Sequence, residues 1–316
     1  MRLSQRAFRR HGTRRAATLL SASLILLSVL LASPAAAAGQ VSQQRFASET
    51  LQRDYPYTLY LPGGYAVSHQ AYPVIYLLHG SFGSETDWVQ GGRLRQTADR
   101  LIRLGVIPPV VIVMPGAESW WIDGHNEAAR TAFFEDLVPH IEESWHVVPE
   151  REWRGVAGLS AGGFGALNFA LERPEMFAAV AAFSPASYHP LPPENSSAWR
   201  HPSFQRDGSF DAELWERSNY TAHLDDYLAQ ELTVPVYLTA GDRDRLNAAH
   251  HARLVQHALE PRQPGDVRLD VLPGGHTWRV WRASLPRGLS FMARHLQAPV
   301  PLETDDAQVP APTPDR

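Results

Sequence analysis

The fold is indicated most clearly by the sequence RGVAGLSAGGFGALNFAL, residues 154–171. Its first residues, 154–158, predict a short buried strand, and residues 161–171 predict a helix rich in Ala and Gly. The turn between them, Gly158-Leu159-Ser160-Ala161-Gly162, fits the pattern G-x-S-x-G. A serine on so tight a strand-to-helix turn needs neighbours without a Cβ atom, because the backbone there is strained. The stretch therefore predicts Ser160 as a nucleophile at the N-terminus of a helix, whose free N–H groups favour an oxyanion.

The segments on either side continue this alternation. Apolar or alternating patterns predict strands at residues 55–61, 74–78, 110–114, 178–183, 234–239 and 267–272. Apolar residues at helical spacing predict helices at residues 131–145, 247–259 and 278–296. Strands that alternate with helices imply an α/β fold with a mostly parallel, twisted sheet and helices on both faces. Residues 187–225 break the rhythm, and we expect this polar stretch, with Trp199 and Trp215, to form an insertion near the site.

Composition narrows the class of protein. The chain has 316 residues, 44% of them hydrophobic, which is enough for one α/β domain with a sizeable core. It contains no Cys and no Lys, which excludes disulfides, thiolate metal sites, a cysteine nucleophile and Schiff-base or P-loop lysines. Residues 1–38 hold six Arg and no acidic residue, so the remainder carries 23 basic against 33 acidic residues. This acidic body argues against nucleic acid or an anionic membrane as a partner.

Residues 1–38 have the layout of a secretory signal peptide. Their Arg residues all lie within residues 2–15, an uncharged apolar run of 14 residues follows at 19–32, and Ala36-Ala37-Ala38 fits a small-x-small cleavage site. A membrane anchor is the alternative, but Ser, Pro and Ala make this run weakly apolar for a span. Thr13-Arg14-Arg15 leaves twin-arginine export open beside the general route. We expect an exported protein, periplasmic or secreted, without stable membrane association after cleavage.

The C-terminus has a composition unlike that of the domain. From Gln297 the sequence QAPVPLETDDAQVPAPTPDR is rich in Pro and acidic residues and lacks aromatic ones. Such a segment cannot bury enough apolar surface to fold, so residues 297–316 are predicted to be a disordered tail. The predicted catalytic domain therefore covers residues 39–296.

A serine hydroxyl needs a base to take its proton, and the sequence offers a histidine in the right place. His276 follows the last predicted strand on a glycine-rich loop, as the chain order Ser, acid, His requires; a solvated loop histidine is the alternative. Two carboxylates follow the preceding strand, Asp242 and Asp244. We prefer Asp244, which lies deeper in the loop, and keep Asp242 as the alternative. The acid would fix the tautomer of His276 and stabilise the imidazolium.

An oxyanion hole needs two backbone donors. One is the N–H group of Ala161, directly after the nucleophile. The other should come from the loop after the strand at residues 74–78, which reads His79-Gly80-Ser81-Phe82-Gly83. We prefer the N–H group of Ser81, with that of Phe82 as the alternative. His79 is expected to be structural.

Tryptophans mark a possible substrate cleft. Ligands of such sheets gather beyond the C-terminal ends of the strands, where we expect four residues to line an aromatic or sugar site: Trp88, Trp120, Trp121 and Trp278. Core packing of large aromatic residues in long loops is the alternative reading, and Trp281 is expected to be core. His250, His251 and His257 lack the spacing of metal ligands, so no metal site is predicted.

The motifs taken together resemble a known family. Residues 78–83 (LHGSFG) with Asp87-Trp88, GLSAGGFGAL, GDRDRL and GGHTWRVW resemble the esterase D-like family of α/β-hydrolases over about residues 45–296. That family includes feruloyl and acetylxylan esterases, enterochelin esterases, S-formylglutathione hydrolases and antigen 85 mycolyltransferases. The resemblance implies an α/β-hydrolase fold without a large separate lid and without a metal or cofactor. In its feruloyl esterase branch, the Gly-x-x-Asp acid falls on Asp244 and the Gly-Gly-His run ends on His276.

The chain departs from the family at two positions. Ser81 stands where an apolar residue is common, and Ala161 stands where Met is frequent. Backbone donors tolerate both changes, but the acyl pocket would differ.

These observations predict an exported serine ester hydrolase that works through an acyl-enzyme. Feruloyl or acetyl carbohydrate esters, or other small esters, suit an exported enzyme better than S-formylglutathione does. An acyltransferase of the antigen 85 type and a siderophore esterase would use the same triad and stay as alternatives. A silent, hydrolase-like binding protein is a remote alternative, since all three triad residue types occur in the required order.

Overall fold

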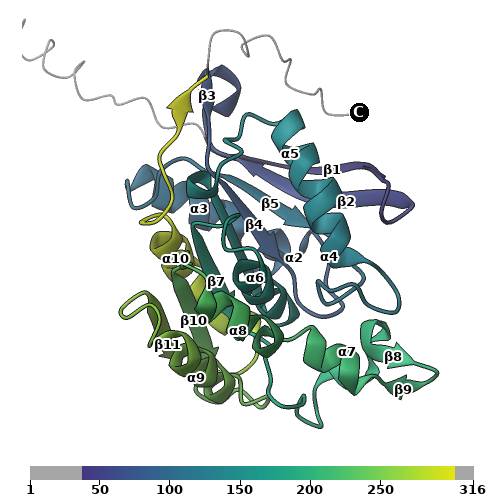
Figure 1. Ribbon diagram of the computed structural model, residues 1–316. Coiled ribbons are helices and arrows are strands. Elements are labelled where there is room, and N and C mark those ends of the chain that lie inside the picture. The colour runs from purple at the N-terminus through teal and green to yellow at the C-terminus, as the bar shows by residue number, and fades with distance from the viewer. Residues whose placement is uncertain (1–37, 303–316) are drawn as a thin grey trace, which may run out of the picture. The chain divides into compact units, whose positions relative to one another are not determined.

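The computed structural model describes residues 38–302. Residues 1–37 of the predicted signal peptide and residues 303–316 of the predicted tail lie outside the described residues. The described part is built on one sheet of eight strands in the order β1-β2-β5-β4-β6-β7-β10-β11 (Figure 1). The strands are β1 Gln40–Ser48, β2 Arg53–Leu61, β4 Val74–Leu78, β5 Val111–Pro115, β6 Arg154–Leu159, β7 Ala179–Phe183, β10 Val236–Gly241 and β11 Val267–Leu272.

Within this sheet only β2 runs against the other strands, because it pairs antiparallel with both β1 and β5. The pairs from β5 to β11 are all parallel. The predicted mostly parallel α/β sheet is therefore confirmed. The chain leaves β4 toward β5 on one side and returns to β6 on the other, so the strand order reverses at β4. Ligand sites of open α/β sheets form beyond the C-terminal ends of strands at such a reversal.

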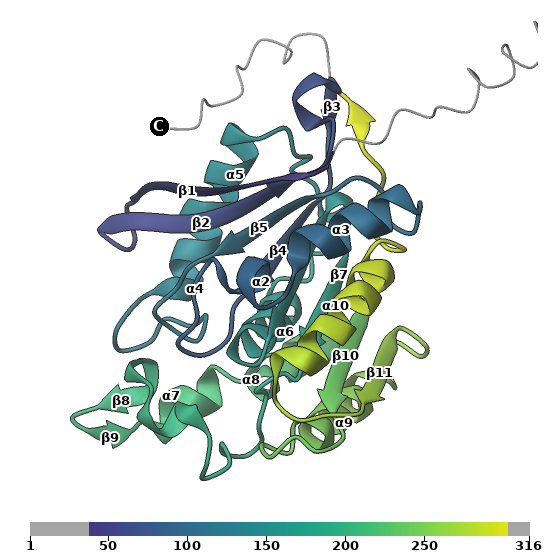
Figure 2. The same ribbon diagram turned by 180° about the vertical axis from the view of Figure 1, so that it is seen from behind.

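Helices cover both faces of the sheet. On the face in front in Figure 1 lie α4 Ala129–Ala132, a π-helical turn Phe133–Leu137, α5 Val138–Ser144, α6 Ala161–Glu172, α8 Tyr220–Ala229 and α9 Ala248–Leu259. The opposite face, in front in Figure 2, carries α2 Asp87–Gln90, α3 Leu94–Arg103 and α10 Trp278–Met292. Across residues 38–302, no helix combines the length and hydropathy that crossing a membrane would require.

Strand β4 shows why the central strands are apolar throughout. All five of its residues are buried. Val74, Tyr76 and Leu78 belong to the cluster under α6, whereas Ile75 and Leu77 belong to the cluster under α3 and α10. Successive side chains of a strand point to opposite faces, so a strand covered on both sides needs an uninterrupted apolar run.

The insertion predicted at residues 187–225 forms short elements of its own. They are the 3-10 turns Ser197–Arg200 and Pro202–Phe204, the hairpin β8 Gln205–Arg206 with β9 Ser209–Phe210, and α7 Ala212–Arg217. Aromatic residues of the insertion, among them Phe204 and Trp215, pack with Trp120 and Phe164 into a separate buried cluster. This cluster joins the insertion to the N-terminal part of α6.

The structure differs from the sequence prediction in several elements, of which three bear on the domain. Strand β1 was not predicted, because its polar residues become a strand only through pairing with β2 at the sheet edge. Helix α3 was also missed. The predicted domain end at Leu296 is wrong: the N–H group of Gln297 donates to the Glu152 carbonyl at 2.9 Å, and β12 Val300–Pro301 pairs with β3 Gln70–Ala71. Main-chain pairing of this kind leaves no mark on composition.

Two further 3-10 turns lie just before strands. Tyr65–Val67 precedes β3, and Arg151–Trp153 precedes β6.

Candidate active site

Ser160 lies on the turn between β6 and α6, in a backbone conformation rare for a residue with a side chain. Its φ of 52° and ψ of −115° lie outside the regions that non-glycine residues prefer. A Cβ atom at Gly158 would lie 2.3 Å from the Gly162 carbonyl oxygen, and one at Gly162 would lie 2.4 Å from that of His79. Both glycines of the motif are thus steric requirements of the turn.

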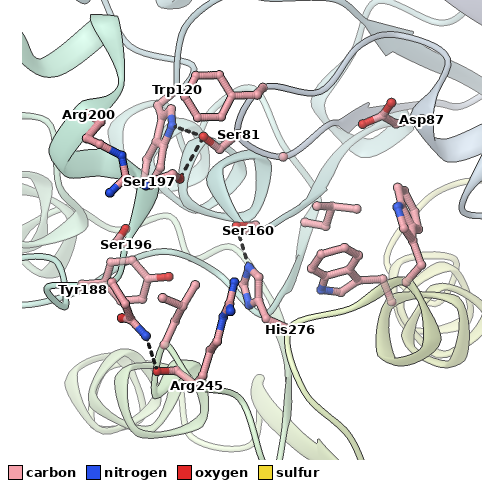
Figure 3. Close-up of a pocket in the computed structure, with 17 residues that line it drawn as sticks. Ser81, Asp87, Trp120, Ser160, Tyr188, Ser196, Ser197, Arg200, Arg245 and His276 are labelled. Atoms are coloured by element: carbon pink, nitrogen blue, oxygen red, sulfur yellow. Dashed lines mark hydrogen bonds between the residues drawn. The ribbon is translucent and has the colours of Figure 1, made fainter.

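The structure brings Ser160, His276 and Asp244 together. The Nε2 atom of His276 lies 2.8 Å from Ser160 Oγ, and its Nδ1 atom lies 2.7 Å from Asp244 Oδ2 (Figure 3). The Asp244 side chain is fully buried, and its other oxygen accepts the Leu246 N–H group at 2.9 Å. A carboxylate at Nδ1 requires a proton there, which leaves Nε2 as an acceptor for the Ser160 hydroxyl.

Asp242, the alternative acid, is engaged elsewhere. Its side chain is 49% exposed and faces Arg243 at 3.5 Å. The Oδ1 atom of Asp242 accepts the N–H group of Gly274 at 2.8 Å, which ties the loop after β10 to the loop after β11. Asp242 therefore holds the histidine loop, while Asp244 faces the imidazole.

The His276 ring is held on a second side by Trp281. The two rings are perpendicular, with centroids 5.1 Å apart. The indole N–H group of Trp281 donates to Ser184 Oγ at 3.3 Å. Edge-to-face contact of this kind limits how far the imidazole can rotate away from Ser160.

The loop after β4 approaches Ser160 closely enough to supply an oxyanion donor. A Cβ atom at Gly80 would lie 2.6 Å from Leu159 Cδ1, so this loop lies against the end of β6. Ser81 and Phe82 both line the same pocket as Ser160. The Ala161 N–H group belongs to the first turn of α6, where backbone donors have no acceptor within the helix.

The side chain of Ser81 is anchored from two directions. Its Oγ atom accepts the indole N–H group of Trp120 at 2.9 Å and the Ser197 hydroxyl at 3.0 Å (Figure 3). Trp120 follows β5, and Ser197 belongs to the insertion. Two separate parts of the fold therefore hold Ser81 in the loop after β4.

His79 holds the loop after β4 in place through its two ring nitrogens. It is 2% exposed, its Nδ1 atom lies 2.8 Å from the Gly80 carbonyl oxygen, and its Nε2 atom accepts the Ala117 N–H group at 3.0 Å. Burial lowers the pKa of His79, so the ring is neutral, with one nitrogen donating and the other accepting. This agrees with the structural role expected for it.

The pocket above Ser160 has a volume of about 350 Å³. Besides Ser160 and His276, it is lined by residues that the sequence analysis did not single out: Tyr188, Asn195, Ser196, Ser197, Arg200, Arg245 and Leu246. Five of these come from the insertion, which has no periodicity to reveal which side chains face the site. Only Arg245 had a signal in the sequence that it could face the pocket, because it directly follows the predicted site residue Asp244.

The structure places two of the four predicted tryptophans, Trp120 and Trp278, at the pocket. Trp281 also lines the pocket, but it is 8% exposed and belongs to a core cluster, as predicted. Trp88 and Trp121 do not line the pocket. Each is 1% exposed, and their indole N–H groups donate to the carbonyl oxygens of Leu78 and His79. They pack in the core and hold the end of β4, because an aromatic residue after a strand can turn inward as well as toward the site.

The histidine cluster on α9 has a packing role. His251 is 7% exposed, and its Nδ1 atom accepts the His189 N–H group at 3.3 Å. Burial lowers its pKa to about 4, so the ring is neutral at physiological pH. Among residues 38–302, no three His, Asp or Glu side chains form a group suited to a metal ion.

The chain is similar to known esterases in sequence and in fold. A family model described as "Putative esterase" matches residues 48–292. An Endo-1,4-beta-xylanase/feruloyl esterase of Xylanibacter ruminicola is 32% identical over 162 residues, which is 48% of this chain and 22% of that protein. An acetyl esterase of Caldicellulosiruptor saccharolyticus is 22% identical over 229 residues, 70% of this chain and 83% of that protein. A solved ferulic acid esterase superposes with a TM-score of 0.71 at 25% identity, covering 82% of this chain and 99% of that one.

Proposed function

Because the chain belongs to this esterase family and has its α/β-hydrolase fold, we propose that it hydrolyses carboxylic esters with Ser160 as the nucleophile. His276 acts as the general base and Asp244 as the carboxylate that orients it. One observation carries the proposal: an unbroken line of hydrogen bonds, 2.8 Å and 2.7 Å long, joins Ser160 through His276 to a fully buried carboxylate.

The reaction follows from the direction of these hydrogen bonds. As Ser160 Oγ attacks the ester carbonyl carbon, its proton passes to His276 Nε2. The N–H groups of Ala161 and Ser81 hold the oxyanion of the tetrahedral intermediate. His276 then gives the proton to the leaving alcohol, and an acyl-enzyme remains on Ser160. Water attacks this acyl group with His276 again as the base, which releases the acid and restores the serine.

Asp244 contributes through its burial. The imidazolium that forms on His276 carries a positive charge, and the carboxylate on its Nδ1–H side stabilises that charge. Asp244 also accepts the Leu246 N–H group at 2.9 Å, which holds the carboxylate in place beside His276.

The size and lining of the pocket support a small ester as the substrate. A volume of about 350 Å³ is at the lower end of ordinary ligand pockets. Trp278, which is half-buried, offers an apolar face to an acyl or sugar ring. The named relatives act on feruloyl and acetyl esters, and the signal-like N-terminus favours an exported enzyme. Feruloyl or acetyl esters of carbohydrates are therefore the substrates to test first.

The test compares the protein with its Ser160→Ala variant on 4-nitrophenyl acetate. We expect kcat to fall by roughly 10³-fold or more, because the nucleophile is removed while the fold is kept. A fluorophosphonate should add its mass to the unmodified protein alone, with the modified peptide containing Ser160. Equal rates in the two proteins would contradict the proposal. Measuring the acetate released and the acetyl group transferred to an added alcohol distinguishes hydrolysis from acyl transfer.

A further inference from the structure

The pocket above Ser160 holds charged side chains that the proposed mechanism does not use. Arg200 and Arg245 line it, together with one carboxylate outside the triad, Asp87. Figure 3 shows both arginines on the side of Ser160 away from Asp87. Both are exposed at the pocket, and among residues 38–302 neither makes an ion pair within 4.0 Å. Their guanidinium groups are therefore free to bind a ligand.

The two arginines are placed by segments that are tied together. Arg200 ends the 3-10 turn Ser197–Arg200 of the insertion, and Arg245 follows Asp244 in the loop before α9. The side-chain amide of Asn195 donates to the Arg245 carbonyl oxygen at 3.1 Å, which links the insertion to that loop (Figure 3). This hydrogen bond holds together the two main-chain segments that carry the arginines.

The neighbouring titratable groups do not offset this positive charge. His201, next to Arg200, is 2% exposed, and burial beside His79 lowers its pKa to about 4. Burial raises the pKa of Tyr188, whose side chain is fully enclosed. Both side chains are neutral near pH 7. The carboxylate of Asp244 is fully buried and already bonded to His276 and to the Leu246 N–H group.

The charge of the pocket also contrasts with that of the protein. Residues 39–316 carry 23 basic against 33 acidic residues, whereas the pocket lining has two arginines against Asp87. Apolar side chains complete much of the remaining wall, among them Leu159, Leu246, Trp278 and Trp281. Low-dielectric walls around like charges strengthen their field at the reacting group.

We propose that Arg200 and Arg245 form an anion subsite that selects esters carrying a carboxylate close to the scissile bond. Guanidinium groups suit a carboxylate because their parallel N–H donors match its two oxygens. This inference rests on the proposed esterase function and narrows it to a substrate class. A substrate carboxylate held by the arginines would orient the ester carbonyl carbon toward Ser160.

The test uses two pairs of esters that differ only in charge. On the acyl side, the monoester of adipic acid with 4-nitrophenol is compared with 4-nitrophenyl hexanoate, which has the same chain length. On the alcohol side, 4-acetoxybenzoate is compared with 4-acetoxybenzamide. For the unmodified protein we expect kcat/KM to favour the anionic member of at least one pair by about 10-fold at low salt. Raising the salt concentration should shrink this preference, because the arginines are exposed.

Arg200→Gln and Arg245→Gln should each lower the anionic-to-neutral ratio of kcat/KM several-fold, and the double variant should bring it close to one. Arg243→Gln is the matched control. Arg243 lies on the same loop and is exposed, but it faces Asp242 and does not line the pocket. It should leave the ratio unchanged.

The outcomes separate this inference from the proposed function. A preference in the acyl pair or in the alcohol pair that disappears in the double variant supports the subsite and locates it. Hydrolysis of all four esters with no preference, or with a preference that persists in the double variant, overturns the subsite and leaves the esterase function standing. Hydrolysis of none of the four overturns the esterase proposal, and the subsite with it.

Discussion

Two aspartates two residues apart show how strongly surroundings decide the role of a side chain. Asp244 is fully buried with Nδ1 of His276 at 2.7 Å, whereas the Asp242 side chain is 49% exposed beside Arg243. In the proposed mechanism only the first can orient the imidazole and stabilise its positive charge. The second ties two loops together through the Gly274 N–H group.

Replacing each aspartate by asparagine separates these roles. We expect Asp244→Asn to lower kcat by roughly 10³- to 10⁴-fold, because an amide cannot stabilise the imidazolium and permits the wrong tautomer. Asp242→Asn should stay within about threefold of the unmodified protein, since an exposed ion pair is weak. Steady-state rates on 4-nitrophenyl acetate, with circular dichroism as a check on folding, measure both. A fall in kcat beyond this limit for Asp242→Asn would contradict the assignment of Asp244, rather than Asp242, as the acid.

Trp120 is expected to position the oxyanion loop, the loop after β4 that carries the proposed donor Ser81, through one hydrogen bond. Its indole N–H group donates to Ser81 Oγ at 2.9 Å, while its ring packs edge-on against Phe164, Phe204 and Trp215. Trp120→Phe keeps most of the ring packing and removes the donor. We expect kcat to fall about 10-fold with a smaller change in KM, because small displacements of reacting groups are costly.

Trp215→Phe is the control for this change. Trp215 belongs to the same buried cluster, but its N–H group donates to the Pro190 carbonyl oxygen and it does not line the pocket. An equal loss of kcat in both variants would assign the effect of Trp120→Phe to packing rather than to the oxyanion loop.

At the scale of elements, the turn from β6 to α6 depends on how closely α6 approaches β4. A Cβ atom at Gly162 would lie 2.4 Å from the His79 carbonyl oxygen and 2.5 Å from that of Leu78. At Gly163 the nearest atoms would lie 3.1 Å away, in Gly158 and Pro185. The first helical turn after Ser160 is therefore pressed against the end of β4 on the Gly162 side.

Alanine at Gly162 or Gly163 would have two opposing effects on stability. The contact distances decide which effect is larger at each position. Alanine gains about 1 kcal/mol of helix propensity over glycine, whereas overpacking a close contact costs roughly 1–3 kcal/mol. Gly162→Ala should therefore lower the free energy of unfolding by up to about 2 kcal/mol and reduce activity, since Ser160 would shift with α6. Gly163→Ala should be near neutral. Urea unfolding and esterase rates test this, and equal effects of the two substitutions would refute it.

At the scale of the whole molecule, buried neutral histidines make stability depend on pH. His201 is 2% exposed, its Nδ1 atom accepts the Ser203 N–H group, and its pKa is lowered from 6.5 to about 4. Between these pH values the unfolded chain binds a proton at this position that the folded protein does not. The free energy of unfolding therefore rises with pH across this interval and falls as the pH drops from about 6.5 toward 4.

His201→Asn tests this dependence, because the asparagine oxygen can accept the same N–H group without titrating. The loss of stability between pH 8 and pH 5 should become smaller by on the order of 1–2 kcal/mol. Urea unfolding at the two pH values, for the variant and the unmodified protein, measures the change. An unchanged gap would show that His201 titrates alike in the folded and unfolded states.

Sequence patterns were enough to predict the α/β class, the positions of the central strands, and the candidates Ser160, Ala161 and His276. These depend on local chemistry: periodicity follows burial, and the G-x-S-x-G turn needs its two glycines wherever it occurs. The motifs also pointed to the loop that holds Ser81.

The folded structure was needed to show which of several similar residues face the site. It put Asp244 rather than Asp242 beside His276, turned Trp88 and Trp121 into the core, and brought Arg200 of the insertion to the same pocket as Arg245. It also carried the domain past Leu296 by pairing β12 with β3. Each of these outcomes depends on a contact between segments far apart in the chain, and such contacts leave no pattern in the local sequence.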